Sequence, residues 1–269
     1  MQKNLLLLVI LLTLSVSAMA TNHYWIGGSG NWNDPNQWSL TSGGAPGATV
    51  PGATDNVIFD NNSGLLSLVD IVNVNVAVTV DTFDFSGVSN TFTFNSPAAV
   101  TFEVQGSVFG NASGVDFTGV WGEITLNALA TGEVVSSLGT TWTQDFRVIG
   151  NAVNLQDDFN NGTSNFYVDF GGLNLSGNTL SCGNFYSATT NVRTLDVANA
   201  RINAVNGYWE VDTLNLTWSG SGFAVYLGDN AGLAEFLGGG LMYDTLRSIS
   251  ATDLNVYSSN DFKLLEVLQ

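Results

Sequence analysis

The amino-acid sequence predicts an all-β fold, a parallel β-solenoid that begins with a tryptophan-rich cap segment. Apolar residues alternate with polar ones along most of the chain, and Gly, Asn, Ser and Thr fill the turns between the apolar runs. A β-sandwich array would show a similar rhythm. The short strands and low-bulk corners favour the solenoid, because each coil must stack about 4.8 Å above the last.

Residues 1–20 are predicted to be a secretory signal peptide. Lys3 precedes an apolar run over residues 5–14, and small residues at 17–20 offer a site for signal peptidase. No cysteine follows the run, and no later segment approaches the roughly 18 apolar residues needed to span a bilayer. We therefore expect a mature chain from Thr21 onward, without a transmembrane segment, that is secreted, extracellular or held at the outer cell surface.

Residues 21–62 are predicted to form the cap, and residues 63–269 the solenoid. The cap segment is rich in Trp, Pro and Gly, whereas the rest has almost no Pro after Pro97. The clearest strand lies between residues 71 and 80, where every second residue is Val. Shorter copies follow at Phe83/Phe85, Phe92/Phe94, Phe102/Val104, Val115/Phe117, Ile124/Leu126, Val153/Leu155, Phe166/Val168, Leu173/Leu175, Leu195/Val197, Leu214/Leu216 and Leu254/Val256. Only residues 233–237 and 261–268 are expected to form a helical turn or two.

Composition excludes several classes of function. Only 11% of the residues are charged, and the formal net charge is −17. A surface this poor in cations cannot neutralise phosphates, so we expect no nucleic-acid partner. Cys182 is the only cysteine, which excludes an intramolecular disulfide and a CxxC-type site.

The opening of the mature chain resembles a known group of proteins. Residues 24–38 follow a YW-x-GG-x-GNW-x-D-x-x-x-W pattern, and residues 55–60 read D-N-V-x-F-D. With the repeats near residues 155–159, 173–180 and 193–197, this resembles the secreted, adhesin-like or hypothetical β-solenoid surface proteins of Bacteroidota, many of which are exported by the type IX system. The resemblance implies a right-handed helix and display at the cell surface. Residues 262–269 do not resemble the sorting domain that members usually carry.

The tryptophans in the cap allow two interpretations. Trp25, Trp32 and Trp38 would suit a platform on which sugar rings stack, with Asn and Asp side chains nearby to bond hydroxyls. The favoured interpretation is structural, because the open end of a solenoid needs a cover for its apolar coil and unpaired strand edge.

Acidic residues suggest a calcium site as a weaker hypothesis. Asp157 and Asp158 are adjacent, and calcium takes six to eight oxygen ligands in extracellular modules. No EF-hand loop or glycine-aspartate nonapeptide accompanies them, so ordinary turn residues are the preferred interpretation. No other cofactor is expected.

An enzyme is the less favoured alternative. Parallel β-helices include polysaccharide lyases and hydrolases, and the Asp157–Asp158 pair superficially resembles the adjacent aspartates of the hydrolases. The sequence lacks the Gly-His-Gly and Arg-x-Lys patterns of such hydrolases, and its acidic surface would repel uronate polymers. The sequence therefore predicts a non-catalytic structural or adhesive module with extracellular glycans or cell-surface proteins as partners; the alternative is a polysaccharide-binding or polysaccharide-degrading β-helix.

Several isolated residues are expected to be structural. His23 is predicted to be solvated near the mature N-terminus, and Cys182 to be a small core residue. Arg193 and Arg201 are expected to pair with Asp196 and Glu210 across coils, in a modest structural role.

Overall fold

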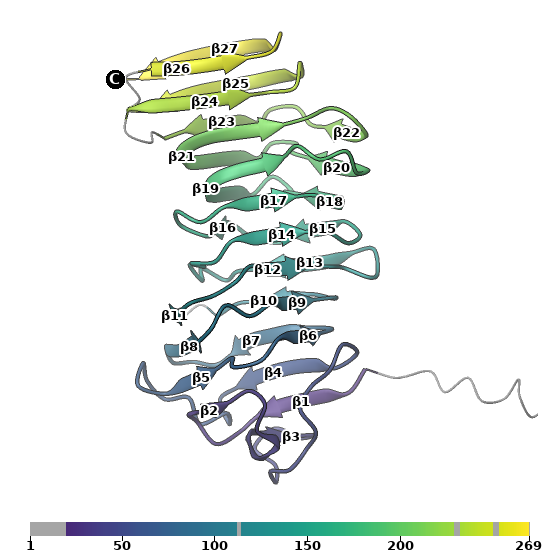
Figure 1. Cartoon of the computed structure of the whole chain (residues 1–269), viewed down its shortest axis with the longest axis vertical. Helices are drawn as coiled ribbons and strands as arrows, with labels where there is room; N and C mark the ends of the chain where they lie inside the picture. Colours follow the sequence, from purple (N-terminus) through teal and green to yellow (C-terminus); the bar gives the residue numbers. More distant parts are fainter. Residues whose placement is uncertain (1–19, 112–113, 229–231, 250–252, 269) are drawn as a thin grey trace, which may run out of the picture.

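The computed structural model describes residues 20–111, 114–228, 232–249 and 253–268. These residues form one stack of coils whose strands lie across its long axis, from the N-terminal end to the C-terminal end (Figure 1). Nearly all neighbouring strands pair in parallel, which confirms the predicted β-solenoid. The predicted signal peptide, apart from Ala20, lies outside the described residues.

Three sheets, parallel except for the β1–β3 pair, form the sides of the stack. Sheet A contains β3 (Trp38–Ser39), β1 (Asn22–Trp25), β4 (Asn56–Asp60), β7 (Phe83–Gly87), β10 (Val108–Phe109), β13 (Glu133–Ser136), β15 (Val153–Leu155), β18 (Gly171–Asn174), β20 (Arg193–Asp196) and β22 (Leu216–Ser219). Sheet B contains β2 (Gly30–Asn31), β5 (Ile71–Asn73), β8 (Phe92–Ser96) and β11 (Val115–Gly119).

Sheet C has 13 strands and extends along most of the molecule. Its path contains β6 (Val78–Val80), β9 (Phe102–Val104), β12 (Ile124–Leu126), β14 (Phe146–Val148), β17 (Phe166–Val168), β19 (Thr179–Ser187), β21 (Arg201–Val211), β23 (Ala224–Leu227), β25 (Met242–Ile249) and β27 (Asp261–Leu268). The strands β16 (Phe159–Asn160), β24 (Leu233–Leu237) and β26 (Asp253–Tyr257) pair beside that path.

The alternating apolar residues become inward columns because parallel register places like positions above one another. In sheet C, Phe146, Phe166 and Phe185 align on successive coils. Their rings are stacked and nearly parallel, with an interplanar angle of 6° between neighbours. Trp209 continues the column, with its ring centroid 4.5 Å from that of Phe185. Burial of these large side chains is the main favourable contribution to folding.

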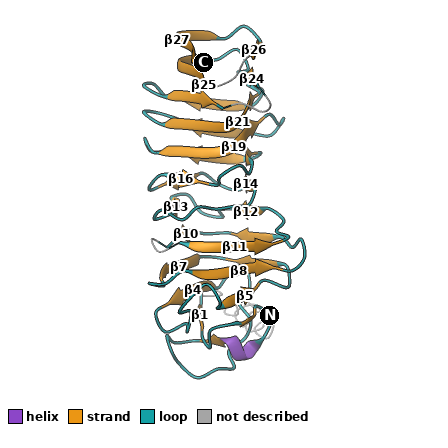
Figure 2. Ribbon diagram, turned by 90° about the vertical axis from the view of Figure 1, so that its left-hand side faces the viewer, coloured by secondary structure: helices purple, strands orange, loops and turns teal. Residues whose placement is uncertain are grey.

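Two segments that were expected to be helical are strands instead. Residues 233–237 form β24, which pairs with β21 and β26, and residues 261–268 form β27, which pairs with β25. Neighbouring coils offer each segment a ladder of backbone hydrogen bonds, and this pairing overrides the local helix propensity. The described residues contain no α-helix, only a 3₁₀-helix at Pro35–Gln37, visible at the N-terminal end in Figure 2.

The N-terminal segment supplies strands to the same sheets as the solenoid. β1 pairs in parallel with β4, while β3 returns antiparallel to β1 and forms the outer edge of sheet A. Asp34 caps the 3₁₀-helix by accepting a hydrogen bond from the Asn36 backbone N–H. The segment from β1 to β3 therefore covers the N-terminal end of the stack.

The coils become shorter partway along the stack. Ser107 and Glu133, which bond across adjacent coils, are 26 residues apart, whereas Asn154 and Asn174 are 20 apart. Sheet B ends at β11, and an isolated bridge between Thr141 and Asn160 follows on this side. A wide coil therefore lies next to a narrower one, and the step between them forms the recess described below.

Candidate functional site

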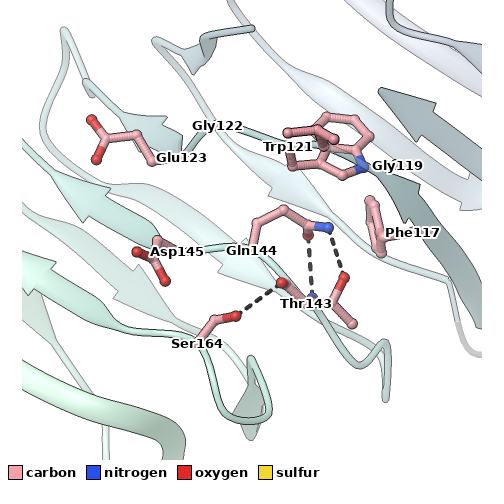
Figure 3. A pocket seen from close by; sticks show the side chains of 10 residues that line it. Phe117, Gly119, Trp121, Gly122, Glu123, Thr143, Gln144, Asp145 and Ser164 are labelled. Atoms are coloured by element: carbon pink, nitrogen blue, oxygen red, sulfur yellow. Dashed lines mark hydrogen bonds between the residues drawn. The ribbon is translucent and has the colours of Figure 1, made fainter. Parts of the chain in front are cut away.

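The recess at this step has a volume of about 630 Å³. One wall is the turn after β11, with Val120, Trp121 and Glu123, and the other is formed by the next two coils at Thr143, Gln144, Asp145 and Ser164 (Figure 3). Pockets of this size are typical of small-ligand sites. The recess lies where the residue 119–123 turn meets the shorter coils that follow it.

Two glycines bring the turn close to the preceding coil. A Cβ on Gly119 would lie 2.1 Å from the Ser96 carbonyl oxygen, and one on Gly122 would lie 2.7 Å from that of Val100. Gly119 also has a φ of +87°, which L-residues rarely adopt. Close approach of these backbones holds Trp121 at the edge of the core.

Trp121 forms the aromatic part of the recess. Its indole N–H donates to the Thr118 carbonyl oxygen at 2.8 Å, and its ring packs edge-on against Phe117 at a centroid distance of 5.8 Å. The side chain is half-buried, in contrast to the completely buried rings of the inner columns. It therefore offers part of an indole surface to the recess from a fixed position.

The polar floor of the recess is ordered by hydrogen bonds. The Gln144 side chain donates to the Thr143 hydroxyl at 2.8 Å and accepts from the Thr143 backbone N–H at 3.2 Å. Ser164 donates to the Thr143 carbonyl oxygen at 2.9 Å (Figure 3). The Ser164 bond joins the two shorter coils below Trp121, and the two Gln144–Thr143 bonds hold the Gln144 side chain within its own coil.

Both carboxylates in the recess have protein partners. Glu123 accepts from the Arg147 guanidinium at 2.7 Å, and Asp145 accepts from the Asn165 backbone N–H at 2.7 Å. Arg147 also bonds Asp169. Burial by itself would lower the pKa of Arg147, but the hydrogen bonds and charges of Glu123 and Asp169 outweigh burial and raise it. Arg147 therefore remains a cation that neutralises this part of the acidic surface.

The two carboxylates begin an outward row that we call the corner column. The register of sheet C aligns the residues before β12, β14 and β17, and then residues within β19, β21 and β24, on successive coils. The corner column consists of Glu123, Asp145, Asn165, Asn184, Tyr208 and Glu235. Asn184 donates to the Asn165 side-chain oxygen at 2.9 Å, which links the two halves of the column.

A second hollow, of about 170 Å³, lies at the far end of the corner column. It is lined by Asn184, Tyr186, Asn206, Gly207, Tyr208, Leu233 and Glu235. Tyr208 donates to Glu210 at 3.2 Å. Burial, followed by the charge of Glu210, raises the pKa of Tyr208 to about 12.

Tyr167 and Tyr186 lie on the outer face of sheet C in the outward row next to the corner column, and their rings stack. The Tyr167 and Tyr186 rings lie 5.0 Å apart and nearly parallel, and Tyr208 continues the stack at 5.3 Å from Tyr186. The Arg147 guanidinium lies 4.3 Å from the centre of the Tyr167 ring. Because the rings cover one another's faces, this stack presents mainly ring edges and hydroxyls to the outside.

The cap tryptophans are placed inside the core. Trp25, Trp32 and Trp38 are at most 1% exposed and pack edge to face at centroid distances of 5.0 and 5.1 Å. The indole N–H of Trp25 donates to the Gly28 carbonyl oxygen and that of Trp38 to the Trp32 carbonyl oxygen. No indole face is left for a sugar ring, so the structure supports the cap interpretation and does not support the platform.

The two aspartates proposed as calcium ligands serve different corners. Asp157 accepts hydrogen bonds from the Ser136 hydroxyl and from the Ser137 and Leu138 backbone N–H groups. Asp158 accepts from the Thr179 backbone N–H. Among the described residues, no group of three or more His, Cys, Asp or Glu side chains is arranged to hold a metal ion.

The structure confirms the predicted environment of Cys182 but not those of His23 and Arg193. Cys182 is completely buried, as expected, and burial raises the pKa of its thiol. His23 is not solvated as expected: it is 2% exposed and contacts the Thr49 hydroxyl at 3.2 Å. Arg193 is not paired with Asp196 but is buried at a corner, where it donates to backbone carbonyl oxygens. Arg201 donates to the Asn203 side-chain oxygen at 2.7 Å, and its guanidinium lies 3.9 Å from the centre of the Tyr226 ring.

Sequence reasoning missed the recess and the corner column. The segment Gly119-Val120-Trp121-Gly122, a tryptophan inside a turn, was the one available signal.

Comparison of the chain with protein-family models, curated protein sequences and solved structures found no match. No helix in the described ranges is long and apolar enough to cross a membrane.

Proposed function

We propose that this chain is a non-catalytic structural or adhesive module that is secreted or held at the outer cell surface. The observation that carries the proposal is the outer face of sheet C, where polar and aromatic side chains stand in register on successive coils. Such a face is rigid, because every coil is hydrogen-bonded to its neighbours and the rings below it are stacked. A rigid, repeating surface suits contact with an extended partner such as a glycan or a cell-surface protein.

Sequence features support the location. The predicted signal peptide directs export, and the resemblance to adhesin-like surface proteins of Bacteroidota favours display outside the cell. A net charge of −17 on a strand-rich molecule also disfavours edge-to-edge association in a crowded exterior.

The experiment measures retention and product formation together. The exported chain is incubated with soluble and insoluble polysaccharides, with whole cells and with immobilised matrix proteins; bound protein and released reducing or unsaturated ends are then quantified. We expect retention on at least one surface without release of sugar ends. Absence of retention on every surface would contradict the adhesive role.

A polysaccharide-degrading β-helix is the second candidate, favoured by one observation. Glu123 and Asp145 line the same recess, and a pair of carboxylates can share acid and base roles at a glycosidic bond. Product release that disappears in both Glu123→Gln and Asp145→Asn variants would establish this alternative and overturn the non-catalytic proposal.

A further inference from the structure

We propose that the corner column and its two hollows form one binding track for an extended, uncharged polysaccharide. This inference rests on the adhesive function proposed above and names the class of ligand. The chain of the ligand would lie along the solenoid axis, from the recess at Trp121 to the hollow at Tyr208.

The spacing of the polar groups in the corner column suits an extended ligand. The corner column places a carboxylate, amide or phenol on each of six successive coils. Five steps of about 4.8 Å give a track of roughly 24 Å. A polymer that repeats its hydroxyl groups along one direction matches such a row, whereas a compact ligand would contact only one hollow.

Aromatic side chains border the hollows at both ends of the proposed track. Trp121 borders the recess, and its partly exposed ring suits the C–H face of a sugar. At the other end, Tyr208 lies in the corner column and its ring lies 5.3 Å from that of Tyr186. Tyr186 and Tyr208 both line the second hollow, so aromatic surface borders this end of the track as well.

The charge of the corner column disfavours an anionic ligand. Glu123 is paired with Arg147, Asp145 accepts a backbone N–H, and Glu235 accepts from the Tyr257 hydroxyl at 3.1 Å. These carboxylates already have partners and keep free acceptor positions, which suit hydroxyl donors. The overall negative charge repels polyanions.

Another hollow, of about 440 Å³, is a poorer candidate. It lies where sheet C strands end, near Asp212, Leu237 and Gly239, and none of its lining residues is aromatic. Its residues do not belong to the corner column.

The test uses arginine substitutions at exposed rims. Val120 and Leu233 border the first and second hollows and are 61% and 37% exposed, so a long side chain there fills the hollow without entering the core. Val192→Arg and Leu214→Arg are matched controls, because these residues are 64% and 54% exposed and line neither hollow. Thermal melting of each variant verifies that it is folded.

The probes are neutral gluco- and manno-oligosaccharides of increasing length, with polygalacturonate and polylysine as anionic and cationic comparisons. Affinity is measured by calorimetry, and shielding of tryptophan by acrylamide quenching. We expect affinity to rise with length until the oligosaccharide spans roughly 24 Å. Val120→Arg and Leu233→Arg should each weaken binding of the longest oligosaccharide by about tenfold or more, and the controls should not.

Several results would overturn the track. If neutral oligosaccharides bind to both rim variants as tightly as to the unaltered chain, the binding site lies elsewhere. Preferential binding of polygalacturonate or polylysine would refute the ligand class. If the chain adheres to cells or matrix proteins but to no neutral glycan, this inference fails while the adhesive function stands. If nothing is retained, both fail.

Discussion

At the scale of single residues, buried polar atoms hold the corners of this solenoid by bonding to the backbone of a neighbouring coil. Arg193 is completely buried and donates to the Asp212 and Leu214 carbonyl oxygens at 2.6 and 3.0 Å. Burial lowers its pKa, and the charges of Asp212 and Asp169 partly offset this effect. The side chain thus fixes the chain that connects β21 to β22.

Asp157 has a similar role, and its replacement should be destabilising. Asp157→Ala removes three hydrogen bonds to residues 136–138, where Leu138 has a φ of 48°, and should lower the free energy of unfolding by about 1–3 kcal/mol. Urea denaturation of the two proteins measures the change. Asp158→Ala, which removes one bond to an exposed corner, is the control and should cost less. Equal stability of the two variants would refute this role.

Replacement of a cap tryptophan should also affect folding. Trp38→Ala removes a fully buried indole that contacts both other cap tryptophans and should lower the free energy of unfolding by about 3–5 kcal/mol. Denaturation monitored by circular dichroism tests this, with the exposed residue in Leu40→Ala as the control. A stable Trp38→Ala protein that has lost glycan retention would restore the platform interpretation.

At the scale of elements, glycines decide how closely coils approach at the corners. Gly171 begins β18 with a φ of +73°, and an added Cβ would lie 1.3 Å from the Gly150 carbonyl oxygen. Gly132 has a φ of +92°, but a Cβ added to it would have no atom within 4 Å. Both glycines have a positive φ, but only Gly132 has room for a side chain.

Alanine at these two positions separates the two effects. Gly132→Ala should cost about 1 kcal/mol from backbone strain alone. Gly171→Ala should cost several times more, because the β15 and β18 coils must move apart. Thermal melting compares the variants, and similar melting temperatures would show that the coils adjust freely.

The tyrosine stack on sheet C predicts a loss of stability at high pH. The pKa of Tyr208 is raised to about 12, and those of Tyr167 and Tyr186 are also raised, in each case mainly by burial. A raised pKa means that the folded protein favours the neutral phenol, so this stability is complete below pH 10 and is lost between about pH 10 and 12. Melting temperatures across this range should fall less steeply for Tyr208→Phe than for the unaltered chain.

At the scale of the whole molecule, burial differs between the two ends. β1 to β4 surround the packed cap tryptophans, whereas β26 and β27 expose apolar side chains such as Leu265 and Val267, 47% and 48% exposed. β27 pairs only with β25 among the described strands. Stability should therefore decrease from the N-terminal end toward β27.

Hydrogen exchange followed by mass spectrometry tests this gradient. Amides of β26 and β27 should exchange well before those of β14 and β17, because local opening at the exposed end disrupts fewer buried contacts. Uniform protection along the stack would indicate that the molecule opens as a single cooperative unit.

The sequence by itself determined that the fold is all-β, since its period of two leaves one face of each strand apolar. Residues such as Phe102, Phe166 and Leu195 were predicted to be strand residues from this alternation, and all are buried. The tight turns could also be predicted from the sequence, because Gly and Asn tolerate the corner geometry.

Only the tertiary structure decided which residues meet on successive coils. Coil length varies, so a local pattern does not reveal that Glu123, Asn165 and Tyr208 stand in one column. The same cause explains the strands found where helical turns were expected at residues 233–237 and 261–268, since their partners are distant in sequence. Pairing between coils, rather than local preference, sets the register and therefore the outer surface.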